Sequence, residues 1–138
     1  MNNINAAITC VHGFVPEKIL TNKDLEKMVD TNDEWIVSRT GIKERRIVSG
    51  GETLSDMGSD VVKEICKKRG ISPLEIDMII VGTITPDHRF PSSSNIICEK
   101  SGATNAWGFD LSAACSGFLF TLILSLIHIS EPTRQVPI

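Results

Sequence analysis

The nearly unbroken apolar run at residues 77–83 (DMIIVGT) constrains the fold more than any other segment of the chain. Such a run is typical of a strand buried on both faces, as strands are in a parallel sheet. A helix is predicted at 92–101 and a second strand at 107–111. Because parallel strands need a crossover connection, this order predicts an α/β layered domain with right-handed crossovers.

The clearest helix is predicted at 54–69, where apolar side chains recur at helical spacing and Gly70 follows as a stop. Shorter elements are indicated by capping-box spacing and by turn residues. They are helices at 22–29 (cap Thr21) and 32–39 (cap Thr31, end Gly41), strands at 4–11 and 44–48, and a helical turn at 72–75.

Composition excludes several classes of protein. The chain has 138 residues and a net charge of −3, so it carries no signal for binding nucleic acid. Its four cysteines show no CxxC spacing, so no zinc or redox motif is present, and we expect reduced thiols in a cytoplasmic protein. The apolar stretch at 118–129 is shorter than the roughly 20 residues of a membrane span, so no membrane association is expected.

Cys115 lies at a bend between the predicted strand at 107–111 and an apolar helix that starts near Phe118. Unpaired N–H groups and the dipole at a helix N-terminus favour a thiolate, which is the nucleophilic form of cysteine. The small neighbours Ala114, Ser116 and Gly117 would let a substrate approach the sulfur. The alternative is a buried structural cysteine, because free cysteines are among the most buried residue types.

Four segments occur in the order typical of one enzyme family: 21–31 (TNKDLEKMVDT), 33–42 (DEWIVSRTGI), 90–92 (FPS) and 113–118 (AACSGF). From about residue 4 to about residue 123 the chain resembles the first part of a β-ketoacyl-acyl carrier protein synthase III, a condensing enzyme of the thiolase superfamily. The resemblance implies a thiolase-like layered fold of which only an incomplete first half is present. Hydroxymethylglutaryl-CoA synthase-like and ketide synthase-like enzymes are the alternatives within the superfamily.

The resemblance implies that Cys115 takes an acyl group from an acyl-CoA and that malonyl-acyl carrier protein then condenses with it. CoA is a substrate here, and neither a cofactor nor a metal is expected. The family works as a homodimer and uses a His and an Asn from its second half. Since neither partner lies in this chain, we expect the fragment alone to bind or accept an acyl group at most.

Three further positions match functional residues of the family. Trp35 and Arg39 are four apart on one helix face and correspond to residues that hold the adenine end of CoA. Phe90 corresponds to a residue that reaches across the dimer and lines the acyl pocket. Without the resemblance, two alternatives remain open: Trp35 packed in the core with Arg39 covering it, and Phe90 covering the local core.

The basic residues near position 40 and the C-terminal tail are considered separately. A basic cluster, defined as Arg39, Lys43, Arg45 and Arg46, is expected either to attract phosphates or the acidic carrier protein, or to form a solvated face. The tail at 124–138 resembles a translated sequencing adapter, so we predict a native half-domain at 1–123 and a non-native tail, in which His128 has no catalytic role.

Overall fold

The computed structural model describes residues 6–130. Within these residues the chain forms two compact units. The hairpin unit is Phe14–Thr53, and the layered unit consists of the remaining described residues, 6–13 and 54–130. Each unit is described by itself.

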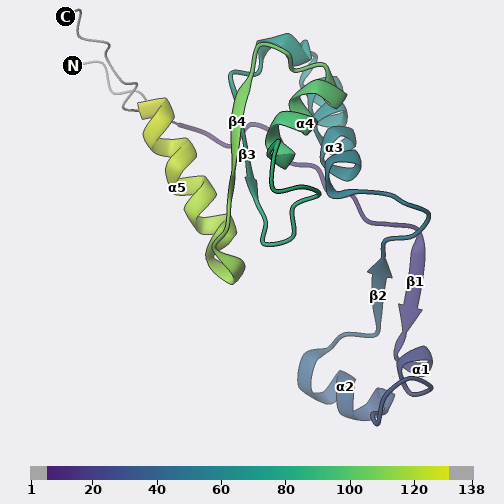
Figure 1. Ribbon diagram of the computed structural model, residues 1–138. Coiled ribbons are helices and arrows are strands. Elements are labelled where there is room, and N and C mark those ends of the chain that lie inside the picture. The colour runs from purple at the N-terminus through teal and green to yellow at the C-terminus, as the bar shows by residue number, and fades with distance from the viewer. Residues whose placement is uncertain (1–5, 131–138) are drawn as a thin grey trace, which may run out of the picture. The chain divides into compact units, whose positions relative to one another are not determined.

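The layered unit is built around two parallel strands, β3 (Met78–Gly82) and β4 (Trp107–Leu111). Their register pairs Met78 with Trp107 and Gly82 with Leu111. Helices α3 (Leu54–Arg69) and α4 (Ser93–Ser101) lie on one side of the strands, and α5 (Gly117–Ser130) lies on the other (Figure 1). This confirms the predicted α/β layered fold, with α4 as the crossover between the strands.

Small residues let the layers approach closely. A β-carbon on Gly58 of α3 would collide with the side chain of Ile97 in α4. One on Gly108 of β4 would collide with the backbone of Ile79 and come within 2.9 Å of the Ser94 β-carbon. The core of this unit therefore consists mostly of short side chains, among them Ser55, Ser59, Cys66, Ser93, Ser94, Cys98, Ser101 and Ala103.

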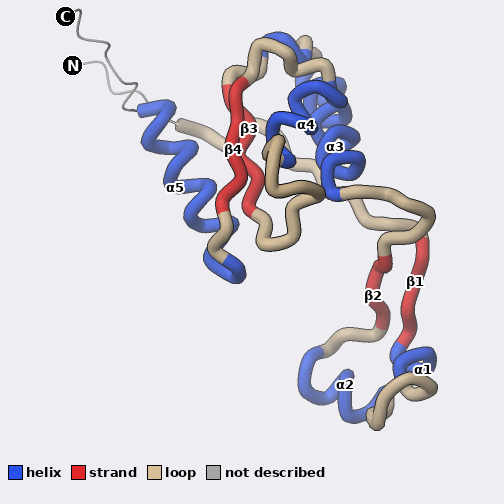
Figure 2. Tube along the Cα trace, in the orientation of Figure 1, coloured by secondary structure: helices blue, strands red, loops and turns tan. Residues whose placement is uncertain are grey.

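The hairpin unit pairs β1 (Lys18–Thr21) with β2 (Glu44–Ile47) in antiparallel register, Lys18 opposite Ile47 (Figure 2). Between them lie α1 (Asn22–Leu25) and α2 (Asp33–Thr40). The Thr21–Asp24 capping box is present, and Gly41 ends α2 with φ 70°, a conformation that glycine adopts without steric cost. Both features agree with the sequence prediction.

Several predicted elements were wrong in extent. Residues 6–11 of the strand expected at 4–11 form no regular structure, because no neighbouring strand pairs with them in the described chain. The helix expected at 22–29 ends at Leu25, where the chain turns so that the Glu26 carboxylate accepts from the Asp33 N–H at 2.8 Å. The N-cap of α2 is Asn32 rather than Thr31. Strand β1 was not predicted.

Strand β3 is only half-buried over Met78–Val81, although its sequence predicted burial on both faces. It has helices on both sides but only one neighbouring strand in the described chain, so the sheet is too narrow to be fully enclosed. Short 3₁₀ turns at Pro73–Glu75 (η1) and Ala114–Ser116 (η2) precede β3 and α5. The first matches the predicted capping box at 72–75.

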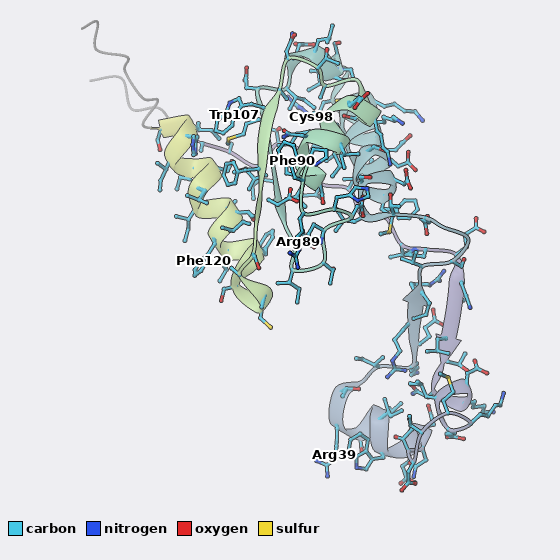
Figure 3. All side chains as sticks on the ribbon, viewed as in Figure 1. Arg39, Arg89, Phe90, Cys98, Trp107 and Phe120 are labelled. Atoms are coloured by element: carbon cyan, nitrogen blue, oxygen red, sulfur yellow. The ribbon has the colours of Figure 1, made fainter. Side chains whose placement is uncertain are left out.

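Helix α5 continues through Ser130, so residues 124–130 are helical, and 131–138 lie outside the described residues. The His128 ring lies edge-on to Trp107, with 5.5 Å between centroids (Figure 3 labels Trp107). Many large apolar side chains of α5 are exposed, Phe118 to 73%. Within residues 6–130, no helix has the length and apolarity needed to cross a membrane. The non-native tail at 124–138 stays a prediction.

Candidate active site

Cys115 is exposed and sits in the 3₁₀ turn η2, between the end of β4 and the start of α5. The alternative of a buried structural cysteine was therefore wrong. Ala114, just before it, has φ 44°, the one positive φ at a residue other than glycine in the described chain. A left-handed conformation costs an L-residue roughly 1–2 kcal/mol, and such strain concentrates at functional sites. The turn therefore holds the thiol at the surface in a conformation that the chain adopts at a cost.

Two buried thiols differ from Cys115 in their surroundings. Cys66 on α3 and Cys98 on α4 are buried, 3% and 6% exposed. Burial raises the pKa of both thiols, and the nearby Glu75 carboxylate raises that of Cys66 further. Both thiols therefore ionise less readily than a free cysteine, and Cys115 is the one exposed cysteine of residues 6–130.

The loops that follow β3 and β4 meet at one edge of the sheet. The Thr83 N–H donates to the Leu111 carbonyl at 3.1 Å, which extends the strand pairing by one residue. A cavity of about 660 Å³ opens here, lined by residues that include Thr83, Arg89 and Ser112. Ser112 precedes Cys115 by three residues. The carboxyl ends of parallel strands are where α/β folds place their ligands.

Two carboxylates fix these loops by capping helices. The Asp87 carboxylate accepts from the N–H groups of Leu54 and Ser55 at 2.8 and 2.9 Å, at the start of α3. The Asp110 carboxylate accepts from Ser93 and Ser94 at 2.7 and 2.9 Å, at the start of α4. Both anions sit at the positive end of a helix dipole. Asp87 therefore has a structural role.

Phe90 lies on the loop between β3 and α4, next to Arg89 (Figure 3). Its side chain is 90% exposed, so the alternative in which it covers the local core was wrong. Phe90 is the most exposed of the large hydrophobic side chains in residues 6–130.

Trp35 and Arg39 lie together on α2 in the hairpin unit. The Arg39 guanidinium is 5.0 Å from the centroid of the Trp35 ring, a cation–π contact, and Trp35 is 54% exposed. A cavity of about 230 Å³ lined by Asp30, Thr31, Asn32 and Trp35 adjoins the indole. The alternative of a Trp packed in the core was wrong, because the ring is half open to solvent.

The basic cluster is smaller in the structure than in the sequence. The Arg45 guanidinium donates to the Asn22 side-chain oxygen, and Arg46 pairs with Glu44 at 3.5 Å. These two cations are engaged within the fold. Arg39 and Lys43 are the members left to meet an anionic ligand.

The structure thus brings Trp35 and Arg39 together in one unit and places Phe90 and Cys115 in the other. Sequence reasoning missed Asn22, Asp87 and Asp110, whose side chains organise the loops. A signal was present for Asp110, a carboxylate inside an otherwise apolar strand. Among residues 6–130, no group of three or more His, Cys, Asp or Glu side chains is placed to bind a metal ion.

Comparison with known proteins gives independent evidence on what the chain resembles. No family model matches the chain. The β-ketoacyl-[acyl-carrier-protein] synthase III 2 of Bacteroides thetaiotaomicron is 52% identical over 123 residues, which are 88% of this chain and 37% of that protein. The chain therefore spans little more than a third of the length of the curated relatives it matches.

Comparison with solved structures gives the same likeness. The 3-oxoacyl-[acyl-carrier-protein] synthase III of Aquifex aeolicus is 46% identical with a TM-score of 0.80, over 84% of this chain and 37% of that one. The priming β-ketosynthase of the R1128 polyketide pathway is 37% identical with a TM-score of 0.80, over 86% and 35%. In sequence and in its thiolase-like fold, the chain is similar to the N-terminal part of proteins named β-ketoacyl-[acyl-carrier-protein] synthase III.

Proposed function

We propose that the protein containing this sequence is a β-ketoacyl-acyl carrier protein synthase III, which starts fatty acid elongation by condensing an acyl-CoA such as acetyl-CoA with malonyl-acyl carrier protein. The observation that carries the proposal is the exposed Cys115, held after the strained Ala114 at the carboxyl end of β4. The sequence likeness to proteins of that name supports it.

The first step uses only this chain's thiol. The Cys115 thiolate attacks the thioester carbonyl, and the tetrahedral adduct expels CoA as its thiolate, which leaves an acyl-cysteine. Malonyl-acyl carrier protein then loses CO₂, and the carbanion that forms attacks the acyl-cysteine. The new carbon–carbon bond releases the Cys115 thiolate and gives a β-ketoacyl product. A His and an Asn of the second half of the family fold are proposed to assist this second step.

The substrate contacts are assigned by the same proposal. Trp35 and Arg39 hold the adenine of CoA, since a flat base stacks on an indole or a guanidinium. Phe90 contacts a second subunit and lines its acyl pocket, which explains a ring left 90% exposed. No cofactor is required, and four free thiols suit a cytoplasmic protein.

The first half-reaction provides a direct test. The purified chain is incubated with acetyl-CoA, and peptide mapping locates the added acetyl group. We expect acetylation of Cys115 and release of one CoA for each acetyl transferred. Cys115→Ala abolishes both, whereas the matched variant Cys10→Ala leaves them unchanged. Acetyl found equally on all four cysteines would contradict the proposal.

A priming ketosynthase of polyketide synthesis is a second candidate, because such an enzyme matches the fold with the same TM-score of 0.80 as the synthase III of Aquifex aeolicus. It shares the cysteine chemistry and differs in the acyl group it accepts and in the carrier protein it serves. The carrier protein distinguishes the two in the full-length protein. Condensation with a malonyl group on a polyketide carrier protein, in preference to the fatty acid carrier protein, would favour the polyketide enzyme.

A further inference from the structure

We propose that Asn22 is a positioning residue for the nucleotide end of the thioester substrate, because its side chain holds both ends of the helix that carries Trp35 and Arg39. The inference rests on the proposed function, which assigns those two residues to CoA. Asn22 itself is too deeply buried to touch a ligand, at 1% exposed.

The Asn22 amide uses both of its donors and its acceptor within the hairpin unit. One Nδ2–H donates to the Asp33 carboxylate at 2.7 Å, and the other donates to the Ile42 carbonyl at 2.8 Å. Its Oδ1 accepts from the Arg45 guanidinium. The side chain is thereby fixed by three partners from three different segments, which is the arrangement that rigidifies a buried polar group.

Two of these partners lie at opposite ends of α2. Asp33 is the first residue of the helix, and Ile42 follows its C-cap Gly41. Eight residues at about 1.5 Å each make a helix of roughly 12 Å, which behaves as a short rigid rod. A rod held at both ends by one side chain cannot tilt or rotate without breaking one of those hydrogen bonds.

The rod carries the substrate contacts on one face. Trp35 and Arg39 are one helical turn apart, and the guanidinium lies 5.0 Å from the ring centroid. Trp35 is 54% exposed, and the guanidinium that contacts its ring belongs to the same helix, so this contact does not tie the ring to the rest of the hairpin unit. The direction of the indole depends on the helix, and the helix depends on Asn22.

The hydrogen bonds also separate two opposite charges. The neutral amide stands between the Arg45 cation and the Asp33 anion, and bonds both. Removing it leaves each of these groups without a partner that it now has, at a cost that is largest for charged groups. The expected response is a shift of the loops at both ends of α2 rather than an empty space.

The test uses the full chain in a Trp107→Phe background, so that Trp35 is the single fluorophore. CoA is titrated against Asn22→Ala, and Asn105→Ala serves as the matched control, because Asn105 makes one hydrogen bond, to the Leu74 carbonyl, in the other unit. We expect Asn22→Ala to shift Trp35 emission and to weaken CoA binding on the order of tenfold. Acetylation of Cys115 by acetyl-pantetheine, which lacks the nucleotide, should not change.

A rescue pair keeps the test decisive if Asn22→Ala does not fold. Asn22→Asp alone sets two carboxylates against each other and should weaken CoA binding. Adding Asp33→Asn reverses the donor and the acceptor, restores that hydrogen bond beside Arg45, and should recover part of the affinity. The double variant still lacks the donor to the Ile42 carbonyl, so only the hydrogen bond at the start of α2 is restored and only part of the CoA affinity should return.

The two ideas fail in different ways. If Trp35 emission in the Trp107→Phe chain with Asn22 intact does not change when CoA is added, the assignment of Trp35 and Arg39 is overturned, and this inference with it. A wild-type chain that responds, with Asn22 variants that bind CoA and emit as the control does, overturns the positioning role alone.

Discussion

The backbone of Gly82, at the end of β3, lies against the backbone of Gly117, the first residue of α5. A β-carbon on Gly82 would lie 3.4 Å from the carbonyl carbon and oxygen of Gly117 and 3.2 Å from the Thr121 methyl. This contact sets where α5 begins, and Cys115 lies two residues before that point. The position of the thiol therefore depends on a close backbone approach at the sheet edge.

The space for an added β-carbon differs between the two glycines, which gives a matched pair of variants. A β-carbon on Gly117 would lie 3.9 Å from Gly82, an ordinary contact. We expect Gly82→Ala to destabilise the chain by about 1–3 kcal/mol through overpacking, and to slow acetylation of Cys115. Gly117→Ala, on a helix, should be neutral or stabilising. Urea denaturation measures both, and equal effects would contradict the asymmetry.

The left-handed Ala114 gives a second prediction. Glycine adopts φ 44° without the steric cost that alanine meets, so Ala114→Gly should leave stability unchanged or raise it by up to about 1 kcal/mol. The same change frees the turn before Cys115, so acetylation by acetyl-CoA should slow. A β-branched residue fits this conformation worst, and Ala114→Val should lose about 1–3 kcal/mol. If Ala114→Gly transfers acetyl faster than the wild type, strain does not serve the site.

Elements that depend on interactions between residues close in sequence were predicted correctly, and elements that depend on distant residues were not. The helix at 54–69 and the strand at 107–111 have the predicted bounds, because periodicity and a terminal Gly70 are local signals. The Thr21 capping box is likewise local. Strand β1 depends on pairing with β2, more than twenty residues away, and its short KILT sequence carries no comparable signal.

The same distinction between local and distant interactions applies to the residues of the candidate site. Cys115 was found from its neighbours in sequence, and the structure adds its exposure and the strained residue before it. Asn22 was noted only as part of a helix start, because its partners Asp33, Ile42 and Arg45 are 11 to 23 residues away. A buried asparagine is recognised by what surrounds it, and that is a property of the folded chain.

Thiol accessibility gives a third prediction. Cys115 is exposed and Cys10 partly so, whereas Cys66 and Cys98 are buried with a raised pKa. Iodoacetamide reacts with exposed thiolates. We expect Cys115 to be labelled first and Cys66 and Cys98 to be labelled only after unfolding in urea. Peptide mapping over a time course checks the order, and early labelling of Cys98 would contradict the packing of α4.

The Asp24 carboxylate gives a prediction about pH. It accepts from the Thr21 hydroxyl at 2.6 Å and from the Lys27 ammonium at 3.1 Å. The Thr21 hydroxyl is the largest cause, and Lys27 the next, of a pKa lowered from 3.8 to about 2. Because the folded pKa lies below the unfolded one, the contribution of Asp24 to stability is fully present above about pH 4 and is lost as the pH falls toward 2.

Removing the Thr21 hydroxyl should narrow the pH range over which Asp24 contributes to stability. In Thr21→Val the Asp24 pKa should rise part of the way toward 3.8, because Lys27 and the backbone N–H of residue 21 still lower it, whereas Thr21→Ser should keep the wild-type value; NMR of the Asp24 side chain measures both. Lys27→Met should move the pKa less, because a solvent-exposed ion pair is weak and screened by salt. Thr21→Val removes the hydroxyl half of the capping box at every pH, and the remaining bond from the residue 21 N–H to the Asp24 carboxylate should be lost at a higher pH than in the wild type. A larger shift from Lys27→Met than from Thr21→Val would show that charge, rather than the capping hydrogen bond, holds this carboxylate ionised.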